Sequence, residues 1–169
     1  MININEYLNN LYTNDIIKES KESIVIKELS IKEYKILNPL WKEFVKDTAN
    51  KTSFKYENKP FEIKINQLSK SKHGVIFVAY DKDKPIGYIM GTINDNNIQK
   101  VKHGGIAQLV VSKNYRGKGI AKNLWSNLNK WFDKYKTKIK WVTSLYNNKE
   151  AIGLYKSFGF KPEMLVMRQ

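Results

Sequence analysis

One junction constrains the fold more than any other part of the sequence, because an apolar run gives way to a helical pattern within a few residues. The run LVV, residues 109–111, is followed by the loop SKNYRGKG and then by an amphipathic stretch that begins at Ile120. A strand that passes through a glycine-bearing loop into a helix presents unpaired backbone N–H groups and the positive end of the helix dipole to one point. The junction therefore predicts an anion site.

The loop itself carries residues that suit a large anion. Gly117 and Gly119 let the backbone approach a bulky diphosphate, because no Cβ stands in the way. Arg116, Lys118 and Lys122 add positive charge, and an arginine can bind two phosphate oxygens at once. The composition of the loop thus favours a phosphorylated ligand.

Two familiar phosphate motifs do not fit these letters. A P-loop, GxxxxGK followed by Ser or Thr, would need glycine at Ser112 and a hydroxyl residue at Gly119. The dinucleotide fingerprint GxGxxG would need glycine at Lys122. Both motifs are excluded.

Apolar patterns on either side of the junction predict the rest of the architecture. Alternating or β-rich runs predict strands over residues 23–30, 74–80, 85–93, 106–111, 139–146 and 164–168. Spacings of three and four predict helices over residues 57–71, from Gly117 to about 135, and over 148–158. This order of elements predicts a mixed α/β fold with a strand-to-helix crossover in its second half.

Three helical regions have a defined apolar face. The region after Ser30 begins with a capping-box signature, Ser30 with Glu33, and should break near Asn38 and Pro39, a second N-cap and first helical position. The inner face of its second piece is expected to hold Leu40, Trp41, Phe44 and Val45. The 57–71 helix should bury Phe61, Ile65 and Leu68. The helix after Gly117 should present Ile120, Leu124, Leu128, Trp131, Phe132 and Tyr135.

The 169 residues fit one domain, residues 23–169, preceded by an accessory amphipathic helix within residues 1–22. The N-terminus has an acidic Glu6 and no basic region before an apolar run, so no secretory signal is expected. No apolar stretch approaches the ~20 residues that cross a bilayer. The chain has no cysteine, which excludes disulfides, thiolate metal sites and a Cys nucleophile. We expect a soluble cytoplasmic protein without a metal.

The formal net charge of +14 would attract polyanions such as nucleic acid, an acidic membrane or a phosphorylated cofactor. The lysines are spread along the chain, however, so compositional bias explains this charge equally well. A nucleic-acid site at Lys136, Lys138 and Lys140, with Tyr135 and Trp141, is disfavoured against a solvated helix end and strand edge, because alternate lysines of a strand project to one face.

Two motifs give the chain a family resemblance. RGKGIA fits the pattern [RQ]xxGx[GA] at Arg116, Gly119 and Ala121. NKEAIGLYKSFGF fits NxxAxxxYxxxGF at Asn148, Ala151, Tyr155, Gly159 and Phe160. With the hairpin IFVAYDKDKPIGYIMG, the chain resembles the GCN5-related N-acetyltransferase (GNAT) family over residues 23–169.

The resemblance implies a mixed, mostly antiparallel central sheet with splayed fourth and fifth strands and helices on both faces. Acetyl-coenzyme A would lie between the splayed strands as acyl donor. The backbone of Leu109, Val110 and Val111 would pair with its pantetheine arm and hold the thioester carbonyl. The resemblance places the diphosphate on Arg116, Gly117, Lys118, Gly119, Ile120, Ala121 and Lys122.

The resemblance also implies direct attack of a neutral amine on the thioester, without an acyl-enzyme. N–H donors near Val110 and Val111 would stabilise the oxyanion. Tyr155 matches the family's proton donor to the departing thiolate, and the alternative is a half-buried tyrosine that only packs. Asn148 would bond a pantetheine amide, cap its helix, or do both.

The general base is the weak point of the resemblance. Relatives often carry a carboxylate on the strand before the loop, where this chain has Ala107 and Gln108. His103 is the nearest upstream histidine, a residue type that can act as a base near neutral pH, but a lone histidine beside two glycines is more typical of a turn. Deprotonation through water, or an acceptor amine of low pKa, are the alternatives. The sequence assigns no base.

The motifs do not identify the acceptor. Its site would be bounded by the first helices, the loop at 50–58 and the C-terminal strand, with KPEML leaving little room for a long final hairpin. The basic surface disfavours strongly cationic acceptors such as polyamines. The N-terminal helix would cover the groove, an apolar patch or a homodimer contact. The prediction is an N-acetyltransferase for a primary amine of a small molecule or peptide; the alternative is an acyl-coenzyme A-binding module of the same fold, and a nucleic-acid-binding protein is less favoured.

Overall fold

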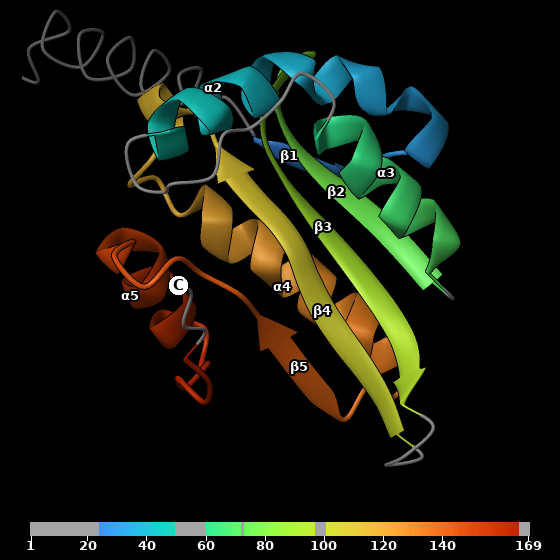
Figure 1. The fold of residues 1–169 in the computed structure, drawn as a ribbon. Coiled ribbons are helices and arrows are strands. Elements are labelled where there is room, and N and C mark those ends of the chain that lie inside the picture. The colour runs from blue at the N-terminus through green and yellow to red at the C-terminus, as the bar shows by residue number, and fades with distance from the viewer. Residues whose placement is uncertain (1–23, 50–59, 72, 97–100, 166–169) are drawn as a thin grey trace, which may run out of the picture.

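A five-stranded sheet in the order β1-β2-β3-β4-β5 forms the centre of the molecule (Figure 1). The structure, a computed structural model, describes residues 24–49, 60–71, 73–96 and 101–165. The strands are β1 Val25–Glu28, β2 His73–Asp81, β3 Lys84–Asn96, β4 Val101–Val111 and β5 Ile139–Val142. Neighbours pair antiparallel except β4 and β5, which are parallel. The predicted mixed, mostly antiparallel sheet is confirmed.

Helices cover both faces of this sheet, as predicted (Figure 1). They are the 3₁₀ helices η1 Ile31–Leu37 and η3 Lys113–Tyr115 and the α-helices α2 Asn38–Thr48, α3 Pro60–Lys70, α4 Ile120–Lys134 and α5 Lys149–Ser157. One face packs against η1, α2 and α3, and the opposite face packs against α4. The chain therefore has two apolar cores separated by the sheet.

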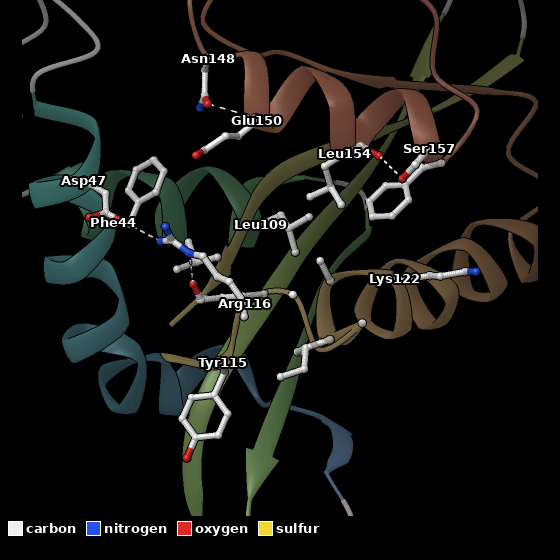
Figure 2. A pocket seen from close by; sticks show the side chains of 18 of the residues that line it. Phe44, Asp47, Leu109, Tyr115, Arg116, Lys122, Asn148, Glu150, Leu154 and Ser157 are labelled. Carbon is white, nitrogen blue, oxygen red and sulfur yellow. Dashed lines mark hydrogen bonds and ion pairs between the residues drawn. The ribbon is translucent and has the colours of Figure 1, made fainter. Parts of the chain in front are cut away.

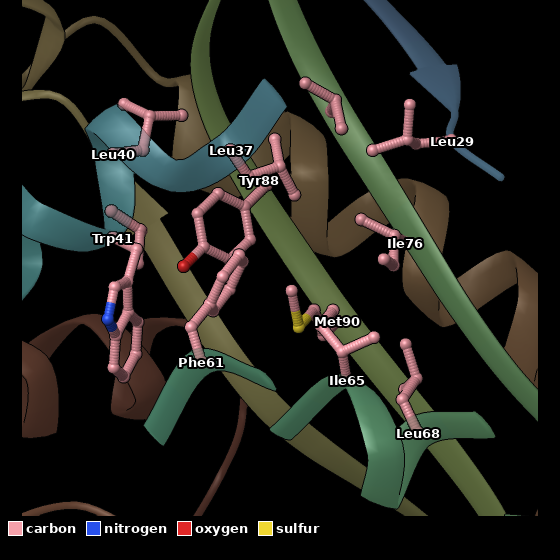
Figure 3. Close-up of a cluster of buried hydrophobic side chains, with 12 residues drawn as sticks. Leu29, Leu37, Leu40, Trp41, Phe61, Ile65, Leu68, Ile76, Tyr88 and Met90 are labelled. Carbon is pink, nitrogen blue, oxygen red and sulfur yellow. The ribbon is translucent and has the colours of Figure 1, made fainter. Parts of the chain in front are cut away.

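The α2–α3 cluster is the core on the first face (Figure 3). It consists of Leu29, Leu37, Leu40, Trp41, Phe61, Ile65, Leu68, Ile76, Val78, Tyr88, Met90 and Val110. The predicted inward positions of α3 are all buried, and on α2 Leu40 and Trp41 are buried while Phe44 and Val45 are partly buried against the same cluster. Helical periodicity thus located this face correctly.

The α4 cluster fills the other face. Its members are Val75, Ala79, Ile86, Ile89, Ile93, Ile106, Ile120, Leu124, Leu128 and Phe132. The four α4 residues among them belong to the predicted stripe, and Trp131 and Tyr135 pack against the cluster while partly buried. This packing fixes α4, and hence the loop before it, against the sheet.

The start of the first helical region differs from the prediction. The Ser30 Oγ accepts a hydrogen bond from Lys32 N at 3.4 Å, whereas Glu33 N donates to the Ser30 carbonyl at 2.9 Å. Ser30 is thus the N-cap of η1, as the motif predicted, but its Oγ accepts from the second helical residue and not from Glu33, because η1 is a 3₁₀ helix with three residues per turn. The break at residue 38 is confirmed as the change from η1 to α2, but Asn38 is helical and its N–H donates to Lys35 O, so it is not a side-chain N-cap.

Strands β4 and β5 separate after a short paired stretch. Only His103 to Ile106 pair with Ile139 to Val142, and β4 then continues to Val111 while the chain after β5 leads toward α5 (Figure 1). A register shift opposite Met90 and Gly91 leaves Ala107 as an extra residue of β4. The last residues of β4 thus have no β5 partner, which confirms the predicted splay.

Three local predictions need correction. The strand expected over 139–146 ends at Val142, where the chain leaves β4. His103 lies within β4, paired with both neighbouring strands, and the turn interpretation is wrong because the glycines beside it face bulky rings rather than form a bend. Met164 and Leu165 belong to no strand and are 91% and 66% exposed, with no neighbouring strand to pair with in the described part of the chain. The remainder of that last strand lies outside the described residues.

Two further expectations also lie outside the described residues, namely the helix in 1–22 and the 50–58 side of the acceptor groove. Among the helices that the structure describes, none has the length and apolarity to cross a membrane.

Candidate functional site

A pocket of about 530 Å³ lies between the end of β4, the loop that follows it, α2 and α5 (Figure 2). Helix α2 contributes Phe44, Asp47 and Thr48, and β4 contributes Leu109, Val110 and Val111. The loop and the start of α4 contribute Tyr115, Arg116, Gly117, Gly119, Ile120, Ala121 and Lys122. The α5 side contributes Asn148, Glu150, Ala151, Leu154, Ser157 and Phe158.

The pocket brings together almost all of the cofactor residues predicted from the sequence. Of that set only Lys118 is absent from the lining, and its Nζ lies 5.1 Å from the centre of the Tyr115 ring. The splay of β4 and β5 creates this convergence, because it leaves the β4 edge facing α5 across a gap. Residues 109–111 and Asn148, 37 or more positions apart in sequence, therefore share one cavity.

The loop has the backbone geometry of an anion site. Gly117 and Gly119 adopt φ values of 76° and 77°, in the left-handed region that favours glycine, and a Cβ on either would meet nothing within 4 Å. Gly119 is the N-cap of α4 and offers no side-chain cap. The first main-chain bond of α4 runs from Asn123 N to Gly119 O at 3.1 Å, so the N–H groups before Asn123 precede the helical ladder. These donors stand at the pocket wall.

Two carboxylates of α2 hold the loop in place. Glu43 accepts hydrogen bonds from Lys113 N at 2.5 Å and from the Ser112 hydroxyl at 3.0 Å. One helical turn further on, Asp47 Oδ2 lies 2.5 Å from Arg116 Nη2. Sequence analysis missed both, and their only local signal is the four-residue spacing that places them on one side of α2.

Arg116 has a second anchor. Its Nε donates to the Val111 carbonyl at 3.0 Å, so the side chain folds back on the strand that precedes the loop. Figure 2 shows the guanidinium between Asp47 and the β4 end of the pocket. The positive charge is thus oriented before any ligand binds.

A third carboxylate anchors the ring that precedes Arg116. The Tyr115 hydroxyl donates to Asp81 Oδ2 at 2.6 Å, while Asp81 Oδ1 is buried without a hydrogen-bond partner among the described residues. Asp81 ends β2, so this contact ties the loop to the β2–β3 hairpin. The loop of residues 112–119, which we call the cradle, is therefore held in place by α2 and by the sheet.

The α5 side of the pocket confirms one of the two roles considered for Asn148. Its Oδ1 accepts from Ala151 N at 3.3 Å and caps α5. Tyr155 does not line the pocket; its ring makes edge contacts with Phe158 and Phe160 at 6.3 Å and 6.2 Å between centroids. Burial raises the pKa of Tyr155 to about 12. Its role as proton donor stays a prediction.

The positions at which relatives often carry a base hold uncharged side chains. Ala107 packs against the α2–α3 cluster, and Gln108 is 6% exposed. The carboxylates that line the pocket come instead from helices, namely Asp47 of α2 and Glu150 of α5 (Figure 2). In the described ranges no group of three or more His, Asp or Glu side chains is placed to hold a metal ion.

Comparison with known proteins agrees with this architecture. The model of the acetyltransferase (GNAT) family matches residues 37–160. No curated protein sequence matches the chain.

Among solved structures, an aminoglycoside acetyltransferase from an uncultured soil metagenomic sample, in complex with trehalose, has a TM-score of 0.67 at 17% identity, covering 88% of this chain and 95% of its own. A ribosomal-protein-alanine N-acetyltransferase from Brucella melitensis biovar Abortus 2308 has a TM-score of 0.65 at 15% identity, covering 87% and 99%. A transcriptional regulator from Bacillus halodurans C-125 has a TM-score of 0.66 at 19% identity, covering 86% and 99%. At these identities the likeness shows the fold.

The family model spans most of the chain, from the end of η1 to just past α5, and so includes the β4 edge, the glycine loop and the cap of α5 that form the pocket. The chain belongs to the acetyltransferase (GNAT) family.

Proposed function

We propose that the protein is an acetyl-coenzyme A-dependent N-acetyltransferase that transfers an acetyl group to a primary amine by direct attack. One observation supports this most strongly: the end of β4, which pairs with β3 but has no β5 partner, leads directly into the left-handed Gly117 and Gly119 loop, and both line one pocket. An extended acyl donor with a diphosphate at one end needs this combination of a free strand edge and an anion cradle.

In this proposal the diphosphate occupies the N-terminus of α4. The N–H groups of Ile120, Ala121 and Lys122 would donate to it, and the guanidinium of Arg116 would add a charge-assisted bond. The pantetheine arm would run along Leu109, Val110 and Val111 and take up hydrogen bonds that β5 leaves unmade. Loss of flexibility on binding would be small at the cradle, because carboxylates already hold it in position.

In the proposed reaction the acetyl group passes directly from the thioester to the amine, without a covalent enzyme intermediate. The amine nitrogen forms a bond to the thioester carbon, the carbon–sulfur bond breaks, and the sulfur leaves with the bonding electron pair. The nitrogen loses one proton and the thiolate gains one, which gives an amide and coenzyme A. Backbone N–H groups aimed at the carbonyl oxygen would stabilise the charge that develops there. Tyr155 is the predicted proton donor to sulfur.

The diphosphate assignment is tested by Gly119→Glu. The substitution places a carboxylate in the cradle at a residue with φ of 77°, and we expect coenzyme A binding, measured by calorimetry, to be lost. Gly153→Glu is the matched control: Gly153 lies on α5 outside the pocket lining, a Cβ there meets nothing within 4 Å, and binding should be retained. Equal affinity of both variants would reject the cradle.

Turnover is tested by thiol release over a set of amines. The solved relatives named for aminoglycosides and for a ribosomal-protein alanine suggest sugar amines and peptide α-amino groups as the first acceptors. Thiol release with at least one of them supports the proposal. Coenzyme A binding without thiol release from acetyl-coenzyme A would favour the second candidate, a binding module, which is supported by the absence of a carboxylate at Ala107 and Gln108.

A further inference from the structure

One buried carboxylate oxygen lies beside the place where the chain enters the fold. Asp81 ends β2, and its Oδ2 accepts the 2.6 Å hydrogen bond from the Tyr115 hydroxyl. Its Oδ1 is buried and has no hydrogen-bond partner among the described residues. Buried polar atoms are nearly always hydrogen-bonded, and a carboxylate is especially costly to leave without partners. Asp81 Oδ1 therefore calls for a donor.

The strand register places the start of the described chain next to Asp81. Val25 of β1 pairs with Tyr80, so Ile24 comes level with Asp81, at the point where β2 ends. Ile24 and Tyr115 both pack against the α4 cluster, so the chain enters on the same face of the sheet as the Tyr115 ring. Residues 1–23, which we call the N-terminal segment, therefore join the fold beside this carboxylate.

The described lysines around Asp81 do not bond its free oxygen. Lys82 follows Asp81 directly, and Lys84 is opposite Asp81 in the β2–β3 register; both side chains are exposed. Lys118 lies beside the Tyr115 ring, with 5.1 Å between its Nζ and the ring centre. None of the three donates to Asp81 Oδ1. The N-terminal segment is the part of the chain that enters next to this oxygen.

The N-terminal segment has a donor of the right charge at the right distance in sequence. Its two lysines are Lys18 and Lys21. Lys21 stands three residues before Ile24, and three residues span at most about 11 Å. Because a lysine carries its ammonium group on a flexible four-carbon stem, Lys21 can reach back to Asp81. An ammonium–carboxylate hydrogen bond is about twice as strong as a bond between neutral groups.

The overall charge of the N-terminal segment favours the same place. The segment has four acidic residues against its two lysines, although the whole chain has a formal net charge of +14. Exposed lysines surround Asp81 and Tyr115 in the described chain, at positions 82, 84, 113 and 118. Charges within about 8 Å of one another still interact at physiological ionic strength. The acidic side chains of the segment would therefore be attracted to the lysines around the buried carboxylate.

We propose that the N-terminal segment docks beside the β2–β3 turn and that Lys21 donates a hydrogen bond to Asp81 Oδ1. The contact lies outside the pocket, because Asp81 does not line it and the Tyr115 hydroxyl is directed away from α5 (Figure 2). Lys21 is thereby a positioning residue: it holds Asp81, Asp81 holds Tyr115, and Tyr115 directly precedes Arg116 in the cradle. The contact goes beyond the proposed function, and only its effect on coenzyme A binding rests on that function.

A double-mutant cycle in the full-length protein tests the contact itself. Lys21→Met removes the ammonium group, and Asp81→Asn removes the charge while it leaves an oxygen for the Tyr115 hydroxyl. We expect Lys21→Met to lower Tm by about 3–10 °C in the wild type but by less than about 1 °C in Asp81→Asn. Lys18→Met is the matched control, because it makes the same change three residues earlier; its effect on Tm should be equal in both backgrounds.

Coenzyme A affinity tests whether the contact positions the cradle. Measured by calorimetry well below Tm, Kd should rise by about two- to fivefold in Lys21→Met, a modest effect because the residue acts through two others. The same substitution should leave Kd unchanged in a Tyr115→Phe background, which lacks the hydroxyl that links Asp81 to the cradle. A purely structural role would lower Tm without this dependence of Kd on Tyr115.

The outcomes distinguish the contact from the proposed function. Equal changes in Tm for Lys21→Met in both backgrounds, or coupling of Asp81 to Lys18 instead of Lys21, would overturn the contact. A coupled Tm with an unchanged Kd in Lys21→Met would overturn the positioning of the cradle. A wild type that does not bind coenzyme A would reject the proposed function, and the Tm cycle would still decide whether Lys21 bonds Asp81.

Discussion

Asp47 and Arg116 form an ion pair across the mouth of the pocket, with 2.5 Å between Oδ2 and Nη2. The two residues are 69 positions apart, and the contact links the last turn of α2 to the loop before α4. Their side chains are 30% and 44% exposed. A diphosphate that approaches Arg116 therefore meets a guanidinium that already has a carboxylate beside it.

Asp47→Asn should tighten coenzyme A binding. The substitution removes a negative charge from the pocket, while the bond from Arg116 Nε to the Val111 carbonyl still holds the guanidinium. We expect Kd to fall by about two- to tenfold at low ionic strength and the gain to shrink with salt, because screening weakens exposed charges. Calorimetry at two salt concentrations measures this.

Glu62→Gln is the control, since Glu62 is an exposed carboxylate of α3 outside the pocket lining. Stability should change by no more than about 1 kcal/mol in Asp47→Asn, because the pair is partly exposed. A weaker affinity for coenzyme A in Asp47→Asn would show that Asp47 orients Arg116 rather than competes for it.

Tyr115→Phe should destabilise the loop. It removes the 2.6 Å bond to Asp81 Oδ2 and leaves both oxygens of that carboxylate without a described partner, since Oδ1 already has none. We expect a loss of about 1–3 kcal/mol in the free energy of unfolding, measured by urea denaturation.

A double-mutant cycle separates the hydrogen bond from ring packing. Asp81→Ala in the Tyr115→Phe background should cost less than Asp81→Ala in the wild type, because the carboxylate has already lost its donor. Equal costs in the two backgrounds would show that the hydroxyl and the carboxylate do not stabilise each other.

Local signals explain which parts of the fold were predictable from sequence. The α4 stripe, the β2–β3 hairpin and the glycine loop are each encoded within about a dozen neighbouring residues, and the structure has all three. The loop is the clearest case, because Gly119 both adopts the left-handed conformation and is the N-cap residue of α4.

The contacts that escaped prediction join distant parts of the chain. Glu43 lies 69 and 70 positions from its two partners, and Asp81 lies 34 positions from Tyr115. In the sequence, Glu43 and Asp47 look like ordinary acids on the solvated face of a helix. Their partners can be identified only once the fold places the loop after β4 beside α2. His103 was misassigned for the same reason: pairing with β3 and β5 overrides the turn tendency of the glycines next to it.

Gly91→Ala should strain the packing of α4 on the sheet. A Cβ at Gly91 would lie within 2.3 Å of Leu128 Cδ1, and Leu128 is fully buried. We expect a loss of about 1–3 kcal/mol, measured by urea denaturation. Leu128→Ala alone should cost about 2–5 kcal/mol through the cavity that it leaves. The double variant should cost less than the sum, because the new methyl group occupies part of that cavity; simple additivity would contradict this account.

Tyr155→Phe should lower turnover more than it lowers coenzyme A affinity. The hydroxyl is the only group removed, so the edge contacts of the ring with Phe158 and Phe160 remain. Loss of a proton donor typically costs about 100-fold or more in rate. Single-turnover rates and calorimetric Kd values distinguish the two effects. An unchanged rate would assign Tyr155 to packing alone.

The same variant should change stability at alkaline pH. Burial raises the pKa of Tyr155 to about 12, whereas an unfolded tyrosine ionises near 10. Between about pH 10 and pH 12 the unfolded chain therefore releases this proton while the native protein retains it, so the unfolded state binds fewer protons and stability falls as pH rises. Below about pH 10 Tyr155 is protonated in both states and adds no pH slope to the free energy of unfolding.

Tyr155→Phe removes this contribution, and its free energy of unfolding should decline less steeply than that of the wild type from about pH 9 to about pH 11. Urea denaturation at both pH values measures the two slopes, and the comparison cancels the titration of lysines, which both proteins share. Parallel slopes would mean that the Tyr155 hydroxyl ionises as readily in the native protein as in the unfolded chain.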